Sequence, residues 1–414
     1  MFPTVYKAGL SSLALMVAHS SVAFAEETAP SEPPVNSLEA ALKDTKPILL
    51  TRLRYETVDQ DGFADSADAL TFRARAGLET GAWNNTTFLI EFDHITGLVD
   101  DFNSTINGKT NFPVVPDPDA TELNRLQIKN TSIPGTTTTL GRQQIAIDDH
   151  RFIGHVGWRQ NEQTFDALRF QNTSFGELIV DTGYITQVNR IFGDDSAAGR
   201  WDGDSYYINA SHPTPLGKLT GFGYFIDVDN LGGIPSSQTL GFRLAGKKKI
   251  DNATLGYAAS YASQTDYGSS NLDYSADYYF VEGSYATGPW SAGLAYEVLG
   301  GDDVRGFQTP LATLHKFQGW TDKFLITPST GVQDFYVKGK YNIGDVGAFN
   351  GANFTAIYHD FSADTSGADY GSEIDLQLSA KWKKLGLTLK FADYNADQFS
   401  VDTQKVWLEV NFKL

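Results

Sequence analysis

The sequence of 414 residues contains no cysteine, which excludes a disulfide framework, a thiolate nucleophile and a cysteine-ligated metal. Beyond its N-terminal region it also lacks a run of about 20 apolar residues, the length that a transmembrane helix needs. Positive charge is scarce, with 32 Lys and Arg against 50 Asp and Glu, which argues against nucleic acid as a partner. No G-x-S-x-G, H-E-x-x-H or P-loop pattern occurs, so we expect no enzymatic activity, no catalytic residues and no cofactor.

The N-terminus has the features of a secretory signal peptide. Lys7 supplies a positive charge, residues 8–17 form a short apolar run, and Ala23-Phe24-Ala25 fits a cleavage site. The alternative is a buried N-terminal helix. We predict a signal peptide over 1–25, followed over 26–47 by an acidic, proline-containing periplasmic tail with one short helix at 38–42.

The last nine residues alternate between apolar and mostly polar side chains. Val406, Leu408, Val410, Phe412 and Leu414 share one face, and Trp407, Glu409, Asn411 and Lys413 share the other. A period of two predicts a β-strand with one apolar and one wet face. The pattern recurs from Ile48 onward and predicts about 18 strands, an even number as in bacterial barrels; they include 48–58, 69–80, 204–211, 331–342, 352–362 and 402–414.

The predicted connections alternate between tight and long, as in outer-membrane barrels with short periplasmic turns and long outer loops. Tight turns include 173–176, 250–253 and 384–386; the long loops are 97–121, 146–162, 187–203 and 300–330. The predicted fold is therefore an all-β transmembrane antiparallel barrel of the bacterial outer membrane over 48–414. Because the turns are short, a plug would have to come from an outer loop such as 97–121 or 300–330.

The wet strand faces predict a lumen with many fixed positive charges. Cationic rings favour anions, and arginine binds carboxylates through two parallel hydrogen bonds. The alternative is that the arginines pair with inward acids and only brace the wall. The side chains predicted to line the substrate path on these faces are Arg52, Arg54, Arg73, Arg75, Glu91, Asp93, Arg125, Lys129, Arg169, Arg243, Lys338 and Lys340.

Asp148-Asp149-His150 has the composition of a metal or acid/base cluster. In an outer loop, a solvated or cation-bridged charge patch is the favoured interpretation, and we assign no metal site. The Asp-rich loops could bind calcium through their carboxylates, but no spacing matches an EF-hand, so calcium binding stays open.

Two segments resemble the alginate export family of outer-membrane porins. One runs from Leu140-Gly141-Arg142 through Gly157-Trp158-Arg159-Gln160-Asn161 to Arg169, and the other from His315-Lys316-Phe317 to Phe324 and on to Asp334. The resemblance implies a monomeric barrel with an electropositive lumen that passes an anionic polysaccharide, an alginate-like uronate polymer, across the outer membrane. It also implies Arg142, Arg159 and Arg169 as the first residues to test for anion contact.

Three functions remain open. They are an export channel for an anionic polysaccharide, an uptake porin for acidic oligosaccharides or other small anions, and a non-transport barrel for adhesion or wall integrity. The basic lumen favours the first two, and the resemblance favours export. The expected partners are outer-membrane lipid and lipopolysaccharide, an anionic polysaccharide or oligosaccharide, and periplasmic export proteins.

Overall fold

The computed structural model describes residues 37–414. The predicted signal peptide and residues 26–36 of the predicted tail lie outside the described residues. The described part contains one α-helix, one 3-10 turn and 18 strands. Their bounds are α1 (Leu38–Lys43), β1 (Lys46–Gln60), β2 (Ala67–Glu79), β3 (Thr86–Asp101), β4 (Ala120–Asn130), β5 (Thr136–Gln143), β6 (Thr164–Phe175), β7 (Leu178–Asn189), β8 (Arg200–Thr214), β9 (Gly217–Ile226), β10 (Ser237–Ile250), β11 (Ala253–Thr265), β12 (Ser275–Thr287), β13 (Trp290–Leu299), η1 (Leu314–Lys316), β14 (Val332–Val346), β15 (Phe349–Ser362), β16 (Asp369–Trp382), β17 (Leu385–Ala396) and β18 (Thr403–Lys413).

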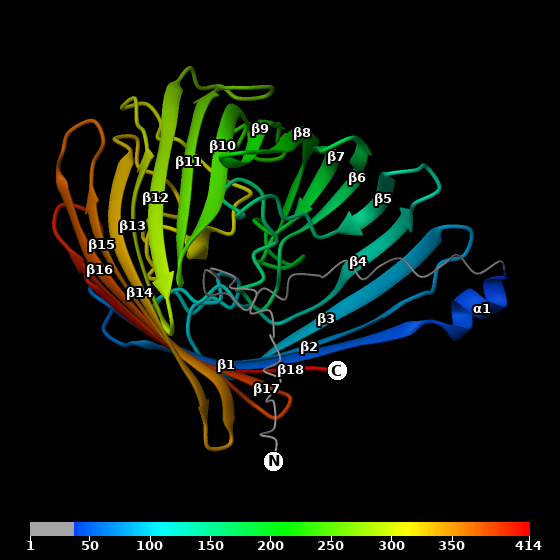
Figure 1. Cartoon of the computed structure of the whole chain (residues 1–414). Coiled ribbons are helices and arrows are strands. Elements are labelled where there is room, and N and C mark those ends of the chain that lie inside the picture. The colour runs from blue at the N-terminus through cyan, green and yellow to red at the C-terminus, as the bar shows by residue number, and fades with distance from the viewer. Residues whose placement is uncertain (1–36) are drawn as a thin grey trace, which may run out of the picture.

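The strands form one closed antiparallel barrel (Figure 1). Each strand pairs with its neighbours in sequence, and β1 also pairs with β18 from Leu50↔Lys413 to Gln60↔Thr403. Closure leaves no edge strand, so the backbone groups of the barrel are paired within it, as a lipid environment requires. The predicted all-β barrel, its strand number and the short helix before it are confirmed.

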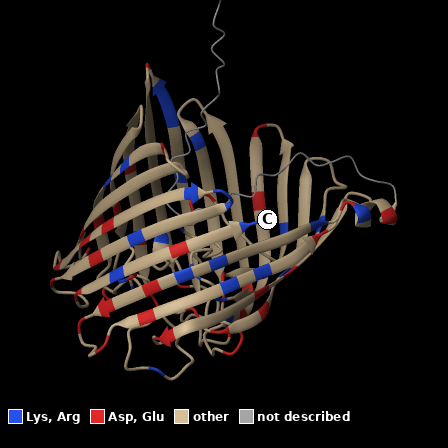
Figure 2. Ribbon diagram, turned by 90° about the horizontal axis from the view of Figure 1, so that it is seen from below, with Lys and Arg blue, Asp and Glu red and all other residues tan. Residues whose placement is uncertain are grey.

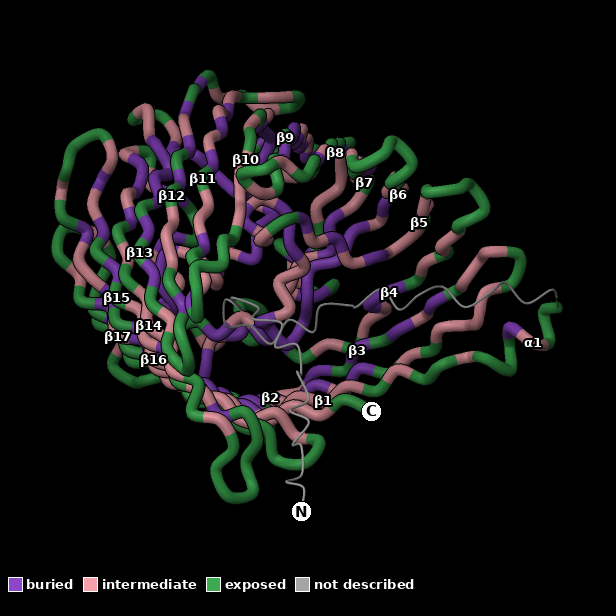
Figure 3. The backbone as a smooth tube through the Cα atoms, in the orientation of Figure 1, coloured by how far each residue is buried: buried purple, intermediate pink, exposed green. Residues whose placement is uncertain are grey.

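Buried residues alternate with less buried ones along the strands, as the period of two predicts (Figure 3). On β1, Arg54 and Glu56 are buried, whereas Leu49 and Leu53 are exposed on the opposite face. A slip of one residue would exchange these sets and place guanidinium groups in hydrocarbon, at about 2–4 kcal/mol each near the midplane. Figure 2 shows positive and negative positions following one another along single strands, so charge is part of the wall and is not confined to its rims.

Two long loops fold into the barrel, and we call them the inner loops: 144–163, between β5 and β6, and 300–331, between β13 and β14 (Figure 1). They contact each other through a parallel bridge between Ile153 and Leu311, with Gly154 donating from its backbone N to the carbonyl of Leu311 at 2.8 Å. The loops named in the sequence analysis as possible sources of a plug were 97–121 and 300–330; the first inner loop, predicted as the outer loop 146–162, was not among them.

Two buried clusters hold the inner loops against the wall. Phe152 of the first inner loop and Phe307 of the second pack with Phe222 and Tyr278 from the strands. Trp158 and Trp320 of the inner loops pack with Trp407 of β18. The described residues include no helix long and apolar enough to cross a membrane.

Candidate functional site: the charged lumen and its inner loops

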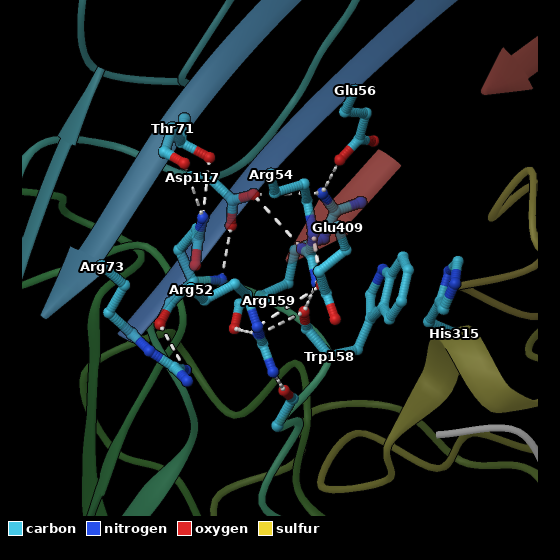
Figure 4. A network of polar contacts seen from close by, with 12 residues as sticks. Arg52, Arg54, Glu56, Thr71, Arg73, Asp117, Trp158, Arg159, His315 and Glu409 are labelled. Atoms are coloured by element: carbon cyan, nitrogen blue, oxygen red, sulfur yellow. Dashed lines mark hydrogen bonds and ion pairs between the residues drawn. The ribbon is translucent and has the colours of Figure 1, made fainter. Parts of the chain in front are cut away.

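Three predicted lumen arginines hold the first inner loop by its backbone (Figure 4). Arg52 donates from Nη1 to the carbonyls of Trp158 and Arg159, at 3.0 Å each, and from Nη2 to that of Gly157 at 3.0 Å. Arg54 also donates to the Trp158 carbonyl. Arg73, which faces Arg52 across the β1–β2 register, donates to the carbonyl of Gln160 at 3.1 Å. The loop has no ladder partner here, so these guanidinium groups satisfy carbonyls that burial would otherwise leave unpaired.

Carboxylates surround the same cluster. Arg54 pairs with Glu409 of β18 at 2.5 Å and lies 3.6 Å from Asp117, in the loop between β3 and β4. Arg159 of the inner loop lies 3.0 Å from Glu56, 3.7 Å from Asp117 and 3.3 Å from Asp322. The third loop, 102–119, thus also reaches the interior, as predicted for 97–121.

A second cluster lies on β2, β3 and β4. Arg75 forms two bonds with Asp93, at 2.7 and 2.6 Å, and its Nη1 lies 2.9 Å from Glu162 of the inner loop. Arg125 forms two bonds with Glu91, at 2.9 and 2.7 Å. Burial opposes ionisation of Glu162, but the charge of Arg75 outweighs it and lowers the pKa of Glu162 well below its usual value. This pair ties the end of the inner loop to the wall.

Four further predicted lumen cations also have carboxylate partners. The pairs are Arg142–Asp166 at 2.8 Å, Arg169–Asp181 at 2.5 Å, Arg243–Asp149 at 2.9 Å and Lys338–Glu282 at 2.6 Å. For these residues and for Arg54, Arg75 and Arg125, the structure agrees with the alternative that arginines pair with acids and brace the wall.

The segment Asp148-Asp149-His150 is not solvated, which was one form of the favoured interpretation; its two acids are instead bound to cationic side chains. Asp148 accepts hydrogen bonds from Asn209 at 2.9 Å and from Lys218 at 2.7 Å, and Asp149 pairs with Arg243. Because the first inner loop folds inward, its acids meet cations of the wall. Within residues 37–414, no group of three or more His, Cys, Asp or Glu is placed to hold a metal ion.

Three predicted lumen cations have no carboxylate within 4 Å among the described residues: Arg73, Lys129 and Lys340. The Nε of Arg73 is buried and has no hydrogen-bond partner in that part of the chain. Its neighbours across and along the sheet are Arg52 and Arg75, so positive charge is concentrated around it. Lys129 and Lys340 lie toward the tight-turn ends of β4 and β14.

A tryptophan cage around Lys390 of β17 fixes both inner loops and was not predicted. The ammonium lies 3.9 Å from the ring centre of Trp158, 3.7 Å from Trp320 and 5.1 Å from Trp407. It donates to Nε2 of His315 at 2.8 Å, and His315 donates from Nδ1 to Asp322 at 2.8 Å. Burial lowers the pKa of His315 well below its usual value, so the ring is neutral and can accept from Lys390.

The sequence carried a partial signal for this cage. Lys390 stands between Leu389 and Phe391 in a predicted strand, which places it on the wet face. Trp158, His315 and Trp320 lie in the two segments that suggested a family resemblance. What the sequence could not show is that these segments meet, because loop residues have no period from which a register follows.

Comparison with known proteins gives structural matches only. No family model matches the sequence, and no curated protein sequence matches it. Among solved structures, OpdK of Pseudomonas aeruginosa with vanillate aligns with a TM-score of 0.71 at 15% identity, covering 90% of this chain and 99% of that one. OpdQ of the same organism aligns with a TM-score of 0.70 at 17% identity, covering 91% of this chain and 99% of that one. OccAB1 of Acinetobacter baumannii aligns with a TM-score of 0.67 at 16% identity, covering 91% of this chain and 98% of that one.

These matches correct the resemblance to the alginate export family, which was wrong. The structural neighbours are outer-membrane porins of the Opd and Occ type, not alginate exporters. What the chain shares with these neighbours is the fold, a closed barrel of 18 antiparallel strands.

Proposed function

We propose that this chain is a passive uptake porin for small anions. The observation that carries the proposal is Arg73, a buried guanidinium on the lumen face with no carboxylate within 4 Å among the described residues and with Arg52 facing it. An unpaired fixed cation on a low-dielectric wall lowers the electrostatic barrier for anions and raises it for cations.

Two further observations support small anions over a polymer. The first inner loop crosses the interior and is bound to opposite walls, to β1 and β2 by Arg52 and Arg73 and to β10 by the pair of Asp149 with Arg243, so the lumen is narrowed. One structural neighbour, OpdK, was solved with vanillate, which is a small carboxylate. Acidic oligosaccharides of a few units stay within this proposal.

The mature chain is proposed to act as a monomer, because a closed barrel has no edge strand that a second copy could extend. Its outer contacts are then lipid and lipopolysaccharide. The residues before β1 are proposed to lie on the periplasmic side, with the tight turns.

The test is the reversal potential of the reconstituted channel under a salt gradient. We expect the wild type to prefer chloride, most strongly in dilute salt, since the Debye length falls from about 10 Å at 0.1 M to about 3 Å at 1 M. Arg73→Gln should move the reversal potential toward zero with the barrel still folded, because glutamine keeps the wet face polar.

Lys43→Gln is the matched control, since Lys43 is an exposed cation on α1 outside the barrel and should leave the reversal potential unchanged. A cation-selective wild type, or an Arg73→Gln channel with unaltered selectivity, would refute the proposal and make the acidic loops the source of permeability.

A further inference from the structure

A second candidate site lies at the long-loop end of the barrel and shares Arg159, His315 and Asp322 with the charged contacts described above. It is a cavity of about 670 Å³ formed by the loops 102–119, 190–199, 227–236 and 300–331, together with the start of β8 and the first inner loop. Pockets that hold small ligands have volumes of about 300–1,000 Å³. Its apolar lining includes Trp201, Leu231, Ile234, Val304, Leu325 and Ile326.

Several of these apolar side chains are unusually exposed for loop residues. Ile326 is 77% exposed, Ile234 62% and Val304 58%. They belong to different loops, 300–331 and 227–236, yet they converge on one cavity. Contiguous apolar surface that faces water mostly marks a binding site, whereas single exposed apolar residues are common.

Two guanidinium groups lie in the lining without a carboxylate within 4 Å among the described residues. Arg190 lies with its central carbon 3.8 Å from the ring centre of Trp201, and it donates from Nη1 to the carbonyl of Pro310 at 3.0 Å. Its Nε is buried without a hydrogen-bond partner in residues 37–414, and the same is true of Nε of Arg305. Burial lowers the pKa of Arg190 only to about 10, so it is charged at neutral pH.

Among residues 37–414 the only acid in the lining is Asp322, and neighbouring side chains already compensate its charge. It accepts from His315 at 2.8 Å and lies 3.3 Å from both Arg159 and Lys405. The cavity therefore combines an extensive apolar surface with uncompensated positive charge, which complements a ligand with an apolar body and one anionic group.

We propose that this cavity binds amphiphilic carboxylates, that is, anions with an aliphatic body of several carbons. The aliphatic groups of Leu231, Ile234, Leu325 and Ile326 hold the body, and Arg190 and Arg305 hold the carboxylate. The proposal rests on the proposed anion uptake and names a substrate class for it.

The position of the cavity gives the site a role in entry. Arg159, His315 and Asp322 are also part of its lining, and they belong to the contacts that join the two inner loops to the wall. A bound anion lies on the long-loop side of the narrowed lumen, so the site selects molecules before they enter it.

The test uses decanoate as the probe on single reconstituted channels, with chloride as the current carrier and decanoate below its micelle concentration. We expect decanoate to reduce the current at a concentration at least about tenfold lower than acetate, because each buried methylene adds about 0.8 kcal/mol of binding free energy. The block should occur at lower concentration from the long-loop side than from the tight-turn side. Decyltrimethylammonium, with the same body and the opposite charge, should not block.

Two variants separate the parts of the site. The double variant L325S/I326S should raise the blocking concentration of decanoate about tenfold and leave the chloride reversal potential unchanged. Arg190→Gln should raise it as well, and should narrow the difference between decanoate and decyltrimethylammonium. Ile133→Ser is the control, since Ile133 is 59% exposed but lies in the tight turn between β4 and β5.

Equal block from both sides, equal block by the cationic probe, or an unchanged response of L325S/I326S would overturn the site. The conductance and thermal unfolding of each variant show that its barrel is intact. If the wild type prefers chloride but decanoate acts no better than acetate, only this inference fails. If the wild type prefers cations, the proposed function fails first.

Discussion

Buried arginines in this barrel differ in what their guanidinium groups bind, and that difference decides how much positive field each of them adds to the lumen. Arg75 has carboxylates at 2.6 and 2.9 Å, so its charge is compensated in place. Arg73, on the same face of the same strand, has only a carbonyl at 3.1 Å. Uniform counting of inward arginines therefore overstates the positive charge of the lumen, since a paired charge adds little field at a distance.

Lys390 gives a prediction at this scale. Lys390→Met keeps the length of the side chain but removes the ammonium from the three indole rings and from His315. We expect a loss of about 2–5 kcal/mol in the free energy of unfolding, because acids near the cage lose a buried partner. Denaturant unfolding in detergent or lipid measures it.

Lys384→Met, at the exposed turn between β16 and β17, is the control and should change the stability by less than about 0.5 kcal/mol. A Lys390→Met protein as stable as this control would show that the cage contributes nothing to loop attachment.

His150 gives a prediction on pH. Burial, and then the charge of Lys316, lower its pKa from 6.5 to about 4, so the docked inner loop holds it neutral. The folded state then binds fewer protons than the unfolded one below pH 6.5, and the contribution of His150 to stability, complete above 6.5, is lost as the pH falls toward 4. We expect the current noise of the open channel to increase over this range.

His150→Asn should weaken this dependence, and asparagine tolerates the positive φ of 68° at this position. His155, whose pKa is also lowered by burial, should account for part of what remains. The exposed His212, replaced in the same way, should leave the pH dependence as it is.

At the scale of elements, the contact between the inner loops depends on a residue without a side chain. A Cβ at Gly154 would lie 2.3 Å from Oγ1 of Thr313 and 3.1 Å from its backbone N, both in the opposing loop. Gly154→Val should therefore push the inner loops apart and raise the single-channel conductance, which planar-bilayer recordings measure.

Gly283→Val is the control for this change, because nothing lies within 4 Å of a Cβ there and the residue is on a strand. An unchanged conductance in Gly154→Val, with the barrel folded, would mean that the loop contact does not limit the current.

The strands could be predicted because lipid on one face requires apolar and polar side chains to alternate. The errors in the predicted strand bounds lie at the strand ends, where this requirement no longer applies. The structure extends the predicted strand 204–211 to Arg200–Thr214, and the strands 331–342 and 352–362 to Val332–Val346 and Phe349–Ser362. These extensions include register shifts at Asn342/Gly344 and Gly344/Val346, which interrupt a period of two. Beyond the hydrocarbon, backbone pairing continues but side chains no longer need to alternate.

The candidate site was predictable to the same extent. Arg75 and Asp93 face each other in the β2–β3 register, so their pairing follows from two correctly predicted strands. The contact of Arg159 with Glu56 joins a loop to a strand far away in sequence, and no pattern of residues determines it. For this reason the sequence predicted the polar faces of the strands but not the contacts of the loops.

The whole molecule shows why the family resemblance misled. The two segments that suggested alginate export form the inner loops and the strands beside them, and the solved structures that match are of the Opd and Occ type, not alginate exporters. An 18-stranded barrel is a frame that accepts different loops, so function depends on what the loops bring together.

A prediction at this scale concerns the seam between the first and last strands. Glu409 of β18 bonds Arg54 of β1 at 2.5 Å and lies 3.4 Å from Arg52. Glu409→Gln leaves both guanidinium groups without this carboxylate, and we expect about 2–4 kcal/mol less stability and slower refolding into lipid vesicles. The refolding is measured by gel electrophoresis of unheated samples, in which the folded barrel migrates differently from the unfolded chain.

Glu177→Gln, at an exposed turn, is the control and should refold like the wild type. Refolding of Glu409→Gln at the control rate would mean that strand pairing alone closes the seam.

The seam also bears on how the protein is made. Arg52 and Arg54 hold the first inner loop by its carbonyls, and they are themselves held by Asn411 and Glu409 of β18, the final strand of the barrel in chain order. Until β18 pairs with β1, the arginines that bind the loop lack their partners on β18. An incompletely assembled barrel would therefore have a wide lumen without selectivity. Closure of the barrel and anchoring of the first inner loop therefore occur in one step. An assembly intermediate that stalls before this step would leave the membrane permeable to solutes that the complete barrel excludes.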